Sequence, residues 1–63
     1  MKYRYVFYLD DVTIDNVVIE LNLDQLLDEI ARVDTITLMS NNKDQVVFCD
    51  KIQAIEFLGE KQQ

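Results

Sequence analysis

Hydrophobic and polar residues alternate along the first third of the chain. Between residues 2 and 9 every odd position is aromatic or leucine, and the even positions carry both basic residues of the segment. Period-two alternation with aromatic and β-branched residues predicts a strand. Asp10-Asp11 favours a turn, because Asp side chains stabilise turns locally. A second strand is predicted over residues 12–21, with a bulge or a short kink at Asp15-Asn16 where the phase of the apolar positions reverses.

The next segment carries the pattern of an amphipathic helix. Its apolar positions recur at i, i+3, i+4 and i+7, namely Leu23, Leu26, Leu27 and Ile30. Asn22 followed by Gln25 three residues later predicts a capping box at the N-terminus. Leu21 and Leu26 occupy the two positions of a hydrophobic staple. We expect a helix over residues 23–33.

The C-terminal third favours β-structure again. Strands are predicted over residues 35–39 and 45–49, joined as a hairpin by the turn cluster Ser40–Asp44. Residues 52–58 fit a third strand because Ile-Glu-Phe alternates, with Ile55 and Phe57 facing inward. They also fit a short helix capped by Asp50, Gln53 and Gly59. The last four residues, 60–63, are expected to fray.

Together these elements predict a small α+β domain formed by residues 1–63. Its sheet is mainly antiparallel, in the order β-β-α-β-β-β with the last element open between strand and short helix, and one amphipathic helix covers one face. At 63 residues and 49% hydrophobic content the chain is near the lower size limit for independent folding. A single cysteine permits no internal disulfide, and the lack of histidine excludes an ordinary zinc site. We therefore expect self-association to supply additional stability.

The residue types needed for common catalytic sites are missing. Without histidine, neither a Ser/His/Asp nor a Cys/His arrangement can form. A single glycine excludes the ordinary phosphate-binding loops. Cys49 lies beside Asp50, whereas a reactive thiol needs electropositive surroundings, so we interpret it as a structural cysteine. The expectation is a protein that is not an enzyme and uses no cofactor.

The sequence indicates neither a metal site nor a targeting segment. The carboxylates of Asp10, Asp11 and Asp15 are hard-cation ligands, but the EF-hand spacing and its glycine are absent, so they are interpreted as a solvated turn. The first nine residues lack the apolar run and small-residue cleavage site of a signal peptide. No stretch approaches the length of a membrane span. With one unpaired cysteine, the cytoplasm is the expected compartment.

The net charge of −6 disfavours binding to nucleic acid and to anionic lipid. The first strand interleaves Lys2 and Arg4 with aromatics, a pattern that can stack bases and neutralise phosphate. Two positive charges are few against the rest of the chain, so this strand is interpreted as a core strand instead.

The first strand carries more large apolar groups than one face can bury. We expect it to lie at a sheet edge and to offer an apolar template for pairing with another chain. The residues expected to mediate this contact are Tyr3, Tyr5, Val6 and Tyr8. The expected function is a non-catalytic protein–protein interaction module that self-associates and binds another protein, of the kind common among bacterial and phage accessory proteins.

An alternative function follows from the charge. Carboxylates on the exposed helix face and in the first turn could replace phosphates and occupy the basic groove of a DNA- or RNA-binding protein. The residues that would form this acidic face are Asp10, Asp11, Asp24, Asp28 and Glu29.

Overall fold

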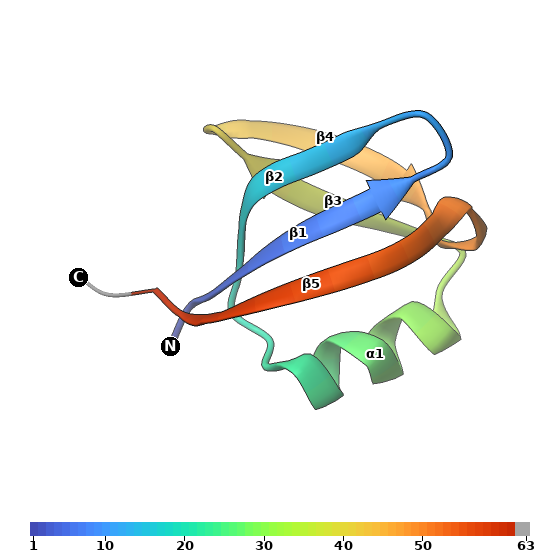
Figure 1. Ribbon diagram of the computed structural model, residues 1–63. Coiled ribbons are helices and arrows are strands. Elements are labelled where there is room, and N and C mark those ends of the chain that lie inside the picture. Colours follow the sequence, from blue (N-terminus) through green and yellow to red (C-terminus); the bar gives the residue numbers. More distant parts are fainter. Residues whose placement is uncertain (62–63) are drawn as a thin grey trace.

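The computed structural model describes residues 1–61 as a five-stranded antiparallel sheet with one α-helix (Figure 1). The elements follow the predicted order β-β-α-β-β-β. Their bounds are β1 Tyr3–Leu9, β2 Thr13–Ile19, α1 Leu23–Arg32, β3 Thr35–Ser40, β4 Lys43–Phe48, a short 3₁₀ turn Cys49–Lys51 and β5 Ile52–Glu60. The predicted α+β class is confirmed. No helix among the described residues is long and apolar enough to cross a membrane.

The strand order β4-β3-β2-β1-β5 places β1 inside the sheet. The last strand returns antiparallel beside the first, so β1 pairs with β2 on one side and β5 on the other. The prediction that the first strand lies at an edge is therefore wrong. Local pattern shows only that a segment is a strand, whereas edge position depends on where residues 52–60 return. The open edges belong to β4 and β5.

The predicted bulge in β2 is confirmed. Opposite β1, the register steps from Tyr5↔Val17 to Phe7↔Ile14, which leaves one extra residue on β2. Asn16 lies there with a φ of 55°, a left-handed conformation that asparagine tolerates better than most residues. Positions 14 and 17 would face opposite sides of a regular strand. The extra residue turns both side chains inward, so that Ile14 and Val17 both reach the core.

The helix begins as its sequence predicts. Asn22 Oδ1 accepts from the Gln25 amide at 2.9 Å, and Gln25 Oε1 accepts from the Asn22 amide at 3.0 Å, which completes the capping box. Leu26 at the staple position is fully buried and Leu21 packs against the same core. The helix ends one residue before its predicted end, at Arg32.

The β3–β4 hairpin is tighter than predicted. Only Asn41 and Asn42 form its turn, with φ of 52° and 64°, and Ser40 pairs with Lys43 inside the ladder. Two successive positive φ values match the two-residue turn that fits the twist of a hairpin. The expected five-residue turn Ser40–Asp44 is thus wrong, and Cys49 lies in the 3₁₀ turn rather than at a strand end.

Residues 52–60 form a strand, as the alternation favoured, and not a short helix. β5 bulges at two points opposite β1, and Gly59 near the second has a φ of 93°. Glu60 pairs with Tyr3, and the Lys61 amide donates to the Lys2 carbonyl at 2.8 Å, so the expected fraying does not hold for these two residues. Residues 62 and 63 lie outside the described part of the chain.

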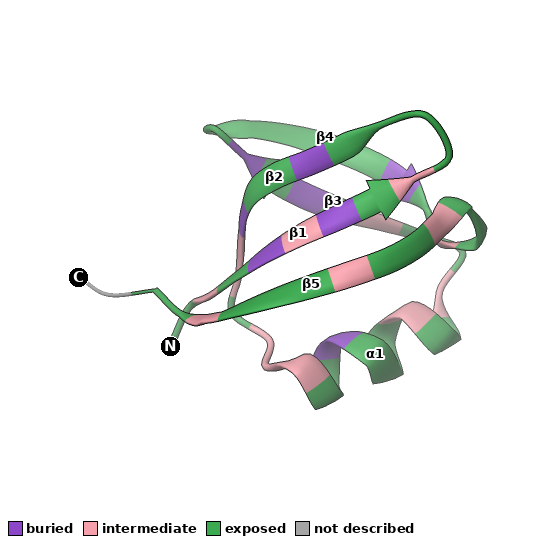
Figure 2. Ribbon diagram, in the orientation of Figure 1, coloured by how far each residue is buried: buried purple, intermediate pink, exposed green. Residues whose placement is uncertain are grey.

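The core lies between the inner face of the sheet and α1. Its buried apolar side chains are Tyr5, Phe7, Ile14, Val17, Leu26, Leu38 and Val47. Figure 2 shows buried positions concentrated in β1, β2 and β3, whereas β5 and most of α1 are half-buried or exposed. Burial is therefore uneven, and apolar side chains between α1 and β5 remain half-buried or exposed.

Candidate protein-binding surfaces

The four residues expected to mediate docking do not share one surface. Tyr5 is completely buried, and Tyr3 is half-buried with its ring centroid 6.1 Å from that of Phe57. Val6 and Tyr8 occupy the opposite face of the sheet, where Tyr8 donates to Glu56 at 2.8 Å. This hydrogen bond is the first cause of the raised pKa of Tyr8. Only Val6 and Tyr8 are thus placed to contact a partner.

The five acidic candidates are divided between two elements. Asp10 and Asp11 form the β1–β2 turn, and the other three lie on α1, at the opposite side of the molecule in Figure 1. Asp28 forms an ion pair with Arg32, and Asp10 accepts from the Gln53 amide at 2.6 Å. The structure does not bring these carboxylates together as one continuous face.

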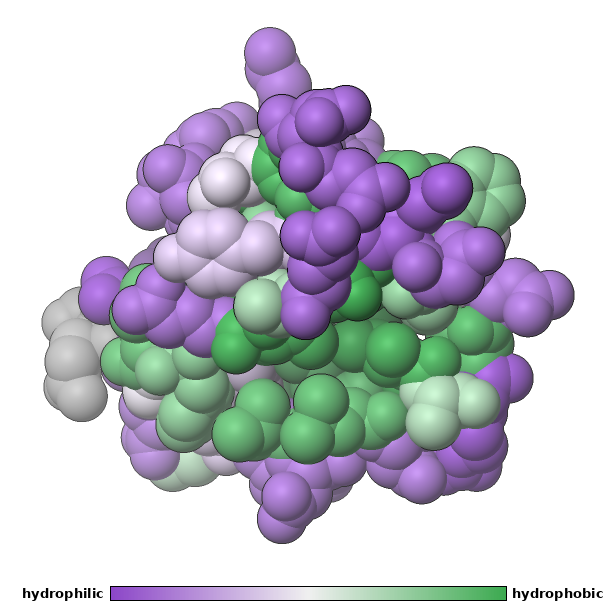
Figure 3. Space-filling view, turned by 45° about the vertical axis from the view of Figure 1, so that its right-hand side comes forward, coloured by the Kyte–Doolittle hydropathy of each residue, from purple (hydrophilic) through white to green (hydrophobic). Residues whose placement is uncertain are grey.

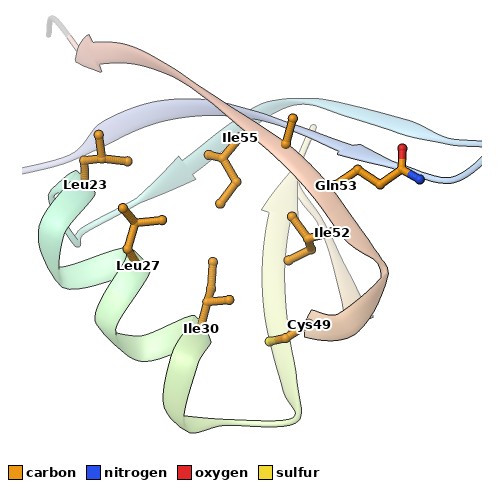
Figure 4. Close-up of a pocket in the computed structure, with 8 residues that line it drawn as sticks. Leu23, Leu27, Ile30, Cys49, Ile52, Gln53 and Ile55 are labelled. Carbon is orange, nitrogen blue, oxygen red and sulfur yellow. The ribbon is translucent and has the colours of Figure 1, made fainter.

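An apolar groove separates α1 from β5. Of the four residues in the helix stripe only Leu26 is buried, whereas Leu27 is 48% exposed. Leu23, Leu27 and Ile30 point toward Ile52 and Ile55 across the groove (Figure 4). The groove has a volume of about 390 Å³. A band of apolar surface with hydrophilic groups above and below it also crosses the face shown in Figure 3.

One end of the groove is acidic. Beyond Ile30 and Cys49 it continues into a second hollow of about 540 Å³, which Asp34 and Asp50 also line. Burial raises the pKa of the Cys49 thiol, and the carboxylates of Asp34, Asp50 and Glu29 raise it further. A negative potential at this end disfavours a thiolate and favours a cation.

The edge of β5 beside this groove is open. Leu9 donates to the carbonyl of Val12, the residue just before β2, so the odd positions of β1 direct their backbone groups toward β2. On the other side of β1, Phe7 lies opposite Ile55 and Tyr5 lies opposite Phe57. These are therefore non-hydrogen-bonded pairs. The backbone N–H and C=O groups of Ile55 and Phe57 consequently point away from the sheet.

The edge of β4 is open too, and its outer face is apolar. The two-residue turn makes Ser40 and Lys43 a hydrogen-bonded pair, so Asp44, Val46 and Phe48 direct their backbone groups outward. Val46 is 67% exposed and Phe48 61% exposed. The charges of Lys43 and Asp44 cancel, so β4 has no net charge although the protein as a whole is acidic.

The groove was missed by sequence reasoning, although its parts were visible. The stripe of four large apolar residues on α1 predicts a helix that covers one face of the sheet. Whether such a stripe is covered depends on how closely β5 approaches it. The sequence does not specify that distance.

Among residues 1–61 there is no group of three or more Cys, Asp or Glu side chains arranged to hold a metal ion. Comparison of the chain with models of known protein families, with curated proteins and with solved structures finds no match.

Proposed function

We propose that the protein is a non-catalytic, cytoplasmic protein–protein interaction module of the bacterial or phage accessory type. The observation that carries this proposal is the open apolar groove between α1 and β5. A 63-residue chain has little apolar surface to spare, yet it leaves Leu27 and part of Leu23 and Ile30 uncovered. Covering them with a partner supplies burial that the small core lacks.

The occupant that best fits the groove is an extended segment of another protein. Such a segment would pair with the outward backbone groups of Ile55 and Phe57 as a sixth strand, and its alternate side chains would enter the groove. β5 begins near Asp50. A partner segment that pairs with β5 in the antiparallel direction therefore has its C-terminal end near Asp50. The partner is thus expected to carry alternating apolar residues followed by Lys or Arg at the C-terminal end, near Asp34 and Asp50.

A second copy of this chain fits the groove poorly. Its net charge of −6 would be repelled by the acidic end. A symmetric β5–β5 pairing of Ile55 with Phe57 would also place the two Glu56 side chains directly opposite each other, which is destabilising.

Self-association is better supported at β4. A two-fold axis through Val46 pairs this residue with its own copy and Asp44 with Phe48 of the second copy, so that all three outward-facing residues join the ladder. The two Asp44 carboxylates then lie about 13 Å apart along the strands, beyond the screening length at physiological salt. The apolar side chains of Met39, Val46 and Phe48 would form one continuous patch across the axis.

The groove is tested by capture from a lysate of the source cell with tagged wild-type protein, Leu27→Asp and Val12→Asp, eluted in steps of rising salt. Val12 is the matched control because it is equally apolar, 54% exposed and outside the groove. The captured protein is then purified and its Kd measured for all three. We expect Leu27→Asp to weaken binding at least tenfold and Val12→Asp to leave it unchanged.

Equal Kd values for the three proteins would overturn the groove as the docking site. A captured protein that normally binds nucleic acid and elutes at moderate salt would instead favour the alternative function, in which the carboxylates of this protein replace the phosphates of a nucleic acid. In that case the charge variants Asp24→Asn and Asp28→Asn would weaken binding, and Leu27→Asp would not.

A further inference from the structure

Half of the cationic side chains of this acidic protein gather at one hollow. The hollow has a volume of about 540 Å³ and lies over the outer face of the sheet, away from the groove. Lys2, Arg4 and Lys61 line it, and the whole chain has six Lys and Arg. The carboxylate of Glu20 also lines it. Among the described residues the structure contains one ion pair, Arg32–Asp28, so none of these three cations is neutralised by a bridge.

The backbone holds these charges together. The Lys61 amide donates to the Lys2 carbonyl at 2.8 Å, which continues the β1–β5 ladder by one step beyond Tyr3↔Glu60. Lys2 and Lys61 are therefore cross-strand neighbours, and Arg4 follows Lys2 on the same face. Like charges directly opposite each other destabilise a sheet. An anion bound between them would convert this repulsion into attraction.

The other side of the hollow supplies neutral donors. Asn16 at the β2 bulge and Asn41 and Asn42 at the β3–β4 turn line it, and all three have positive φ. Asn16 Nδ2 donates to Asn41 Oδ1 at 3.1 Å. Among residues 1–61 this is the one hydrogen bond of these two side chains, so the side-chain amide of Asn41 and the second N–H of Asn16 can donate to a ligand.

We propose that this hollow is an anion site for a phosphate-bearing ligand. The guanidinium of Arg4 matches a phosphate through two parallel N–H bonds, the two lysines supply point charges, and the asparagines donate from the opposite wall. The volume is in the range of small-molecule sites. A free nucleotide and the backbone of a single nucleic-acid strand share this chemistry. The site is independent of the groove, because no residue lines both.

The test is an NMR titration of the ¹⁵N-labelled full chain with inorganic phosphate, with ADP and with an eight-nucleotide oligouridylate, each at constant ionic strength against chloride. Arg4→Gln removes the guanidinium that donates the two parallel N–H bonds. Lys51→Gln is the matched control, because Lys51 lies outside the hollow. We expect shifts at the side-chain amides of Asn16, Asn41 and Asn42. Arg4→Gln should raise Kd at least fivefold, and Lys51→Gln should not change it.

Thermal unfolding provides a second readout. Phosphate should raise the Tm of the wild type more than chloride does at equal ionic strength, and Lys61→Gln should lose most of that difference. In low salt without phosphate, Lys61→Gln should itself raise the Tm because it removes the repulsion with Lys2.

Each outcome decides the matter. If ADP binds and the oligonucleotide binds no more tightly, the ligand is a small phosphorylated molecule. If the affinity for the oligonucleotide is at least tenfold higher than for ADP, the ligand is a nucleic-acid strand. Shifts that are the same in phosphate and chloride, or the same in wild type and Arg4→Gln, would overturn the anion site and leave the groove proposal unaffected.

Discussion

The hydroxyl of Tyr5 donates to the backbone carbonyl of Leu21 at 2.6 Å. Tyr5 is fully buried in the inner strand β1, and Leu21 immediately precedes the N-cap of α1. The bond thus joins an inner strand of the sheet to the start of the helix, and it satisfies the polar atom of a buried aromatic side chain. It also explains why a tyrosine, rather than a phenylalanine, occupies a core position.

Tyr5→Phe should lower the free energy of unfolding by about 1 kcal/mol, the usual net worth of an internal hydrogen bond. The same substitution at Tyr8, which is exposed and bonds to Glu56, is the control and should have a smaller effect. Urea denaturation of both variants measures the difference. Equal losses at the two positions would show that the bond to Leu21 contributes little.

Alkaline pH should destabilise the protein through Tyr5. Burial, with a smaller contribution from the charge of Tyr3, raises the pKa of Tyr5 above its ordinary value of 10.0. A raised pKa in the folded state means that its stabilising contribution is complete below pH 10.0 and is lost as the pH rises through the folded-state pKa. Unfolding free energies measured from pH 8 upward should decline less steeply in Tyr5→Phe than in the wild type.

Asn22→Ala should cost about 1 kcal/mol, because it removes the acceptor of the capping box at the start of α1. Asn22→Asp keeps an acceptor and adds a negative charge at the positive end of the helix dipole, so it should retain most of the stability. Thermal denaturation followed by circular dichroism compares the three proteins. Similar losses in both variants would mean that the cap is not the cause.

Val46→Lys should shift the protein toward monomer, because it places a charge on the two-fold axis proposed at β4. Val12→Lys, at an apolar position of similar exposure in the β1–β2 connection, should not. Light scattering over a hundredfold range of concentration gives the mass of each. A wild type that stays monomeric throughout that range would contradict self-association through β4.

Cys49 should react slowly with iodoacetamide at pH 8, because burial and the nearby carboxylates raise its pKa and reduce the thiolate fraction. Asp50→Asn should speed the reaction a few-fold, whereas Asp11→Asn, which does not contribute to the shift, should leave the rate unchanged. Filling of the adjacent groove by a partner segment should slow it again. A rate equal to that of free cysteine would contradict the acidic character of this end.

Much of the fold could be predicted because its signals are local. The apolar spacing and the Asn22–Gln25 box specify α1 to within one residue, and the phase reversal at Asp15-Asn16 specifies the bulge. The errors arose where neighbouring signals compete. Ser40 and Asp44 are turn-forming residues, yet the tight turn at Asn41-Asn42 draws both into the ladder because two positive φ values match the hairpin twist.

The candidate sites were less predictable. Tyr3, Tyr5, Val6 and Tyr8 were chosen on the expectation of an edge strand. Strand alternation already places them on two faces, and the pairing of β1 with β2 and β5 covers both of its backbone edges. Lys2, Arg4 and Lys61 meet only because the two ends of the chain are antiparallel neighbours. No spacing within the first strand could have revealed a lysine 59 positions away as the neighbour of Lys2.

The sequence by itself determines which segments of this protein are strands and helix and which side chains share a face, because these properties depend on neighbours a few residues apart. Tertiary structure alone decides which strands are edges, how far α1 stands from β5, and which charges converge. Those properties depend on contacts between distant segments, whose free energies are set by packing rather than by local pattern. The groove, the open β4 edge and the cationic hollow all belong to this second group.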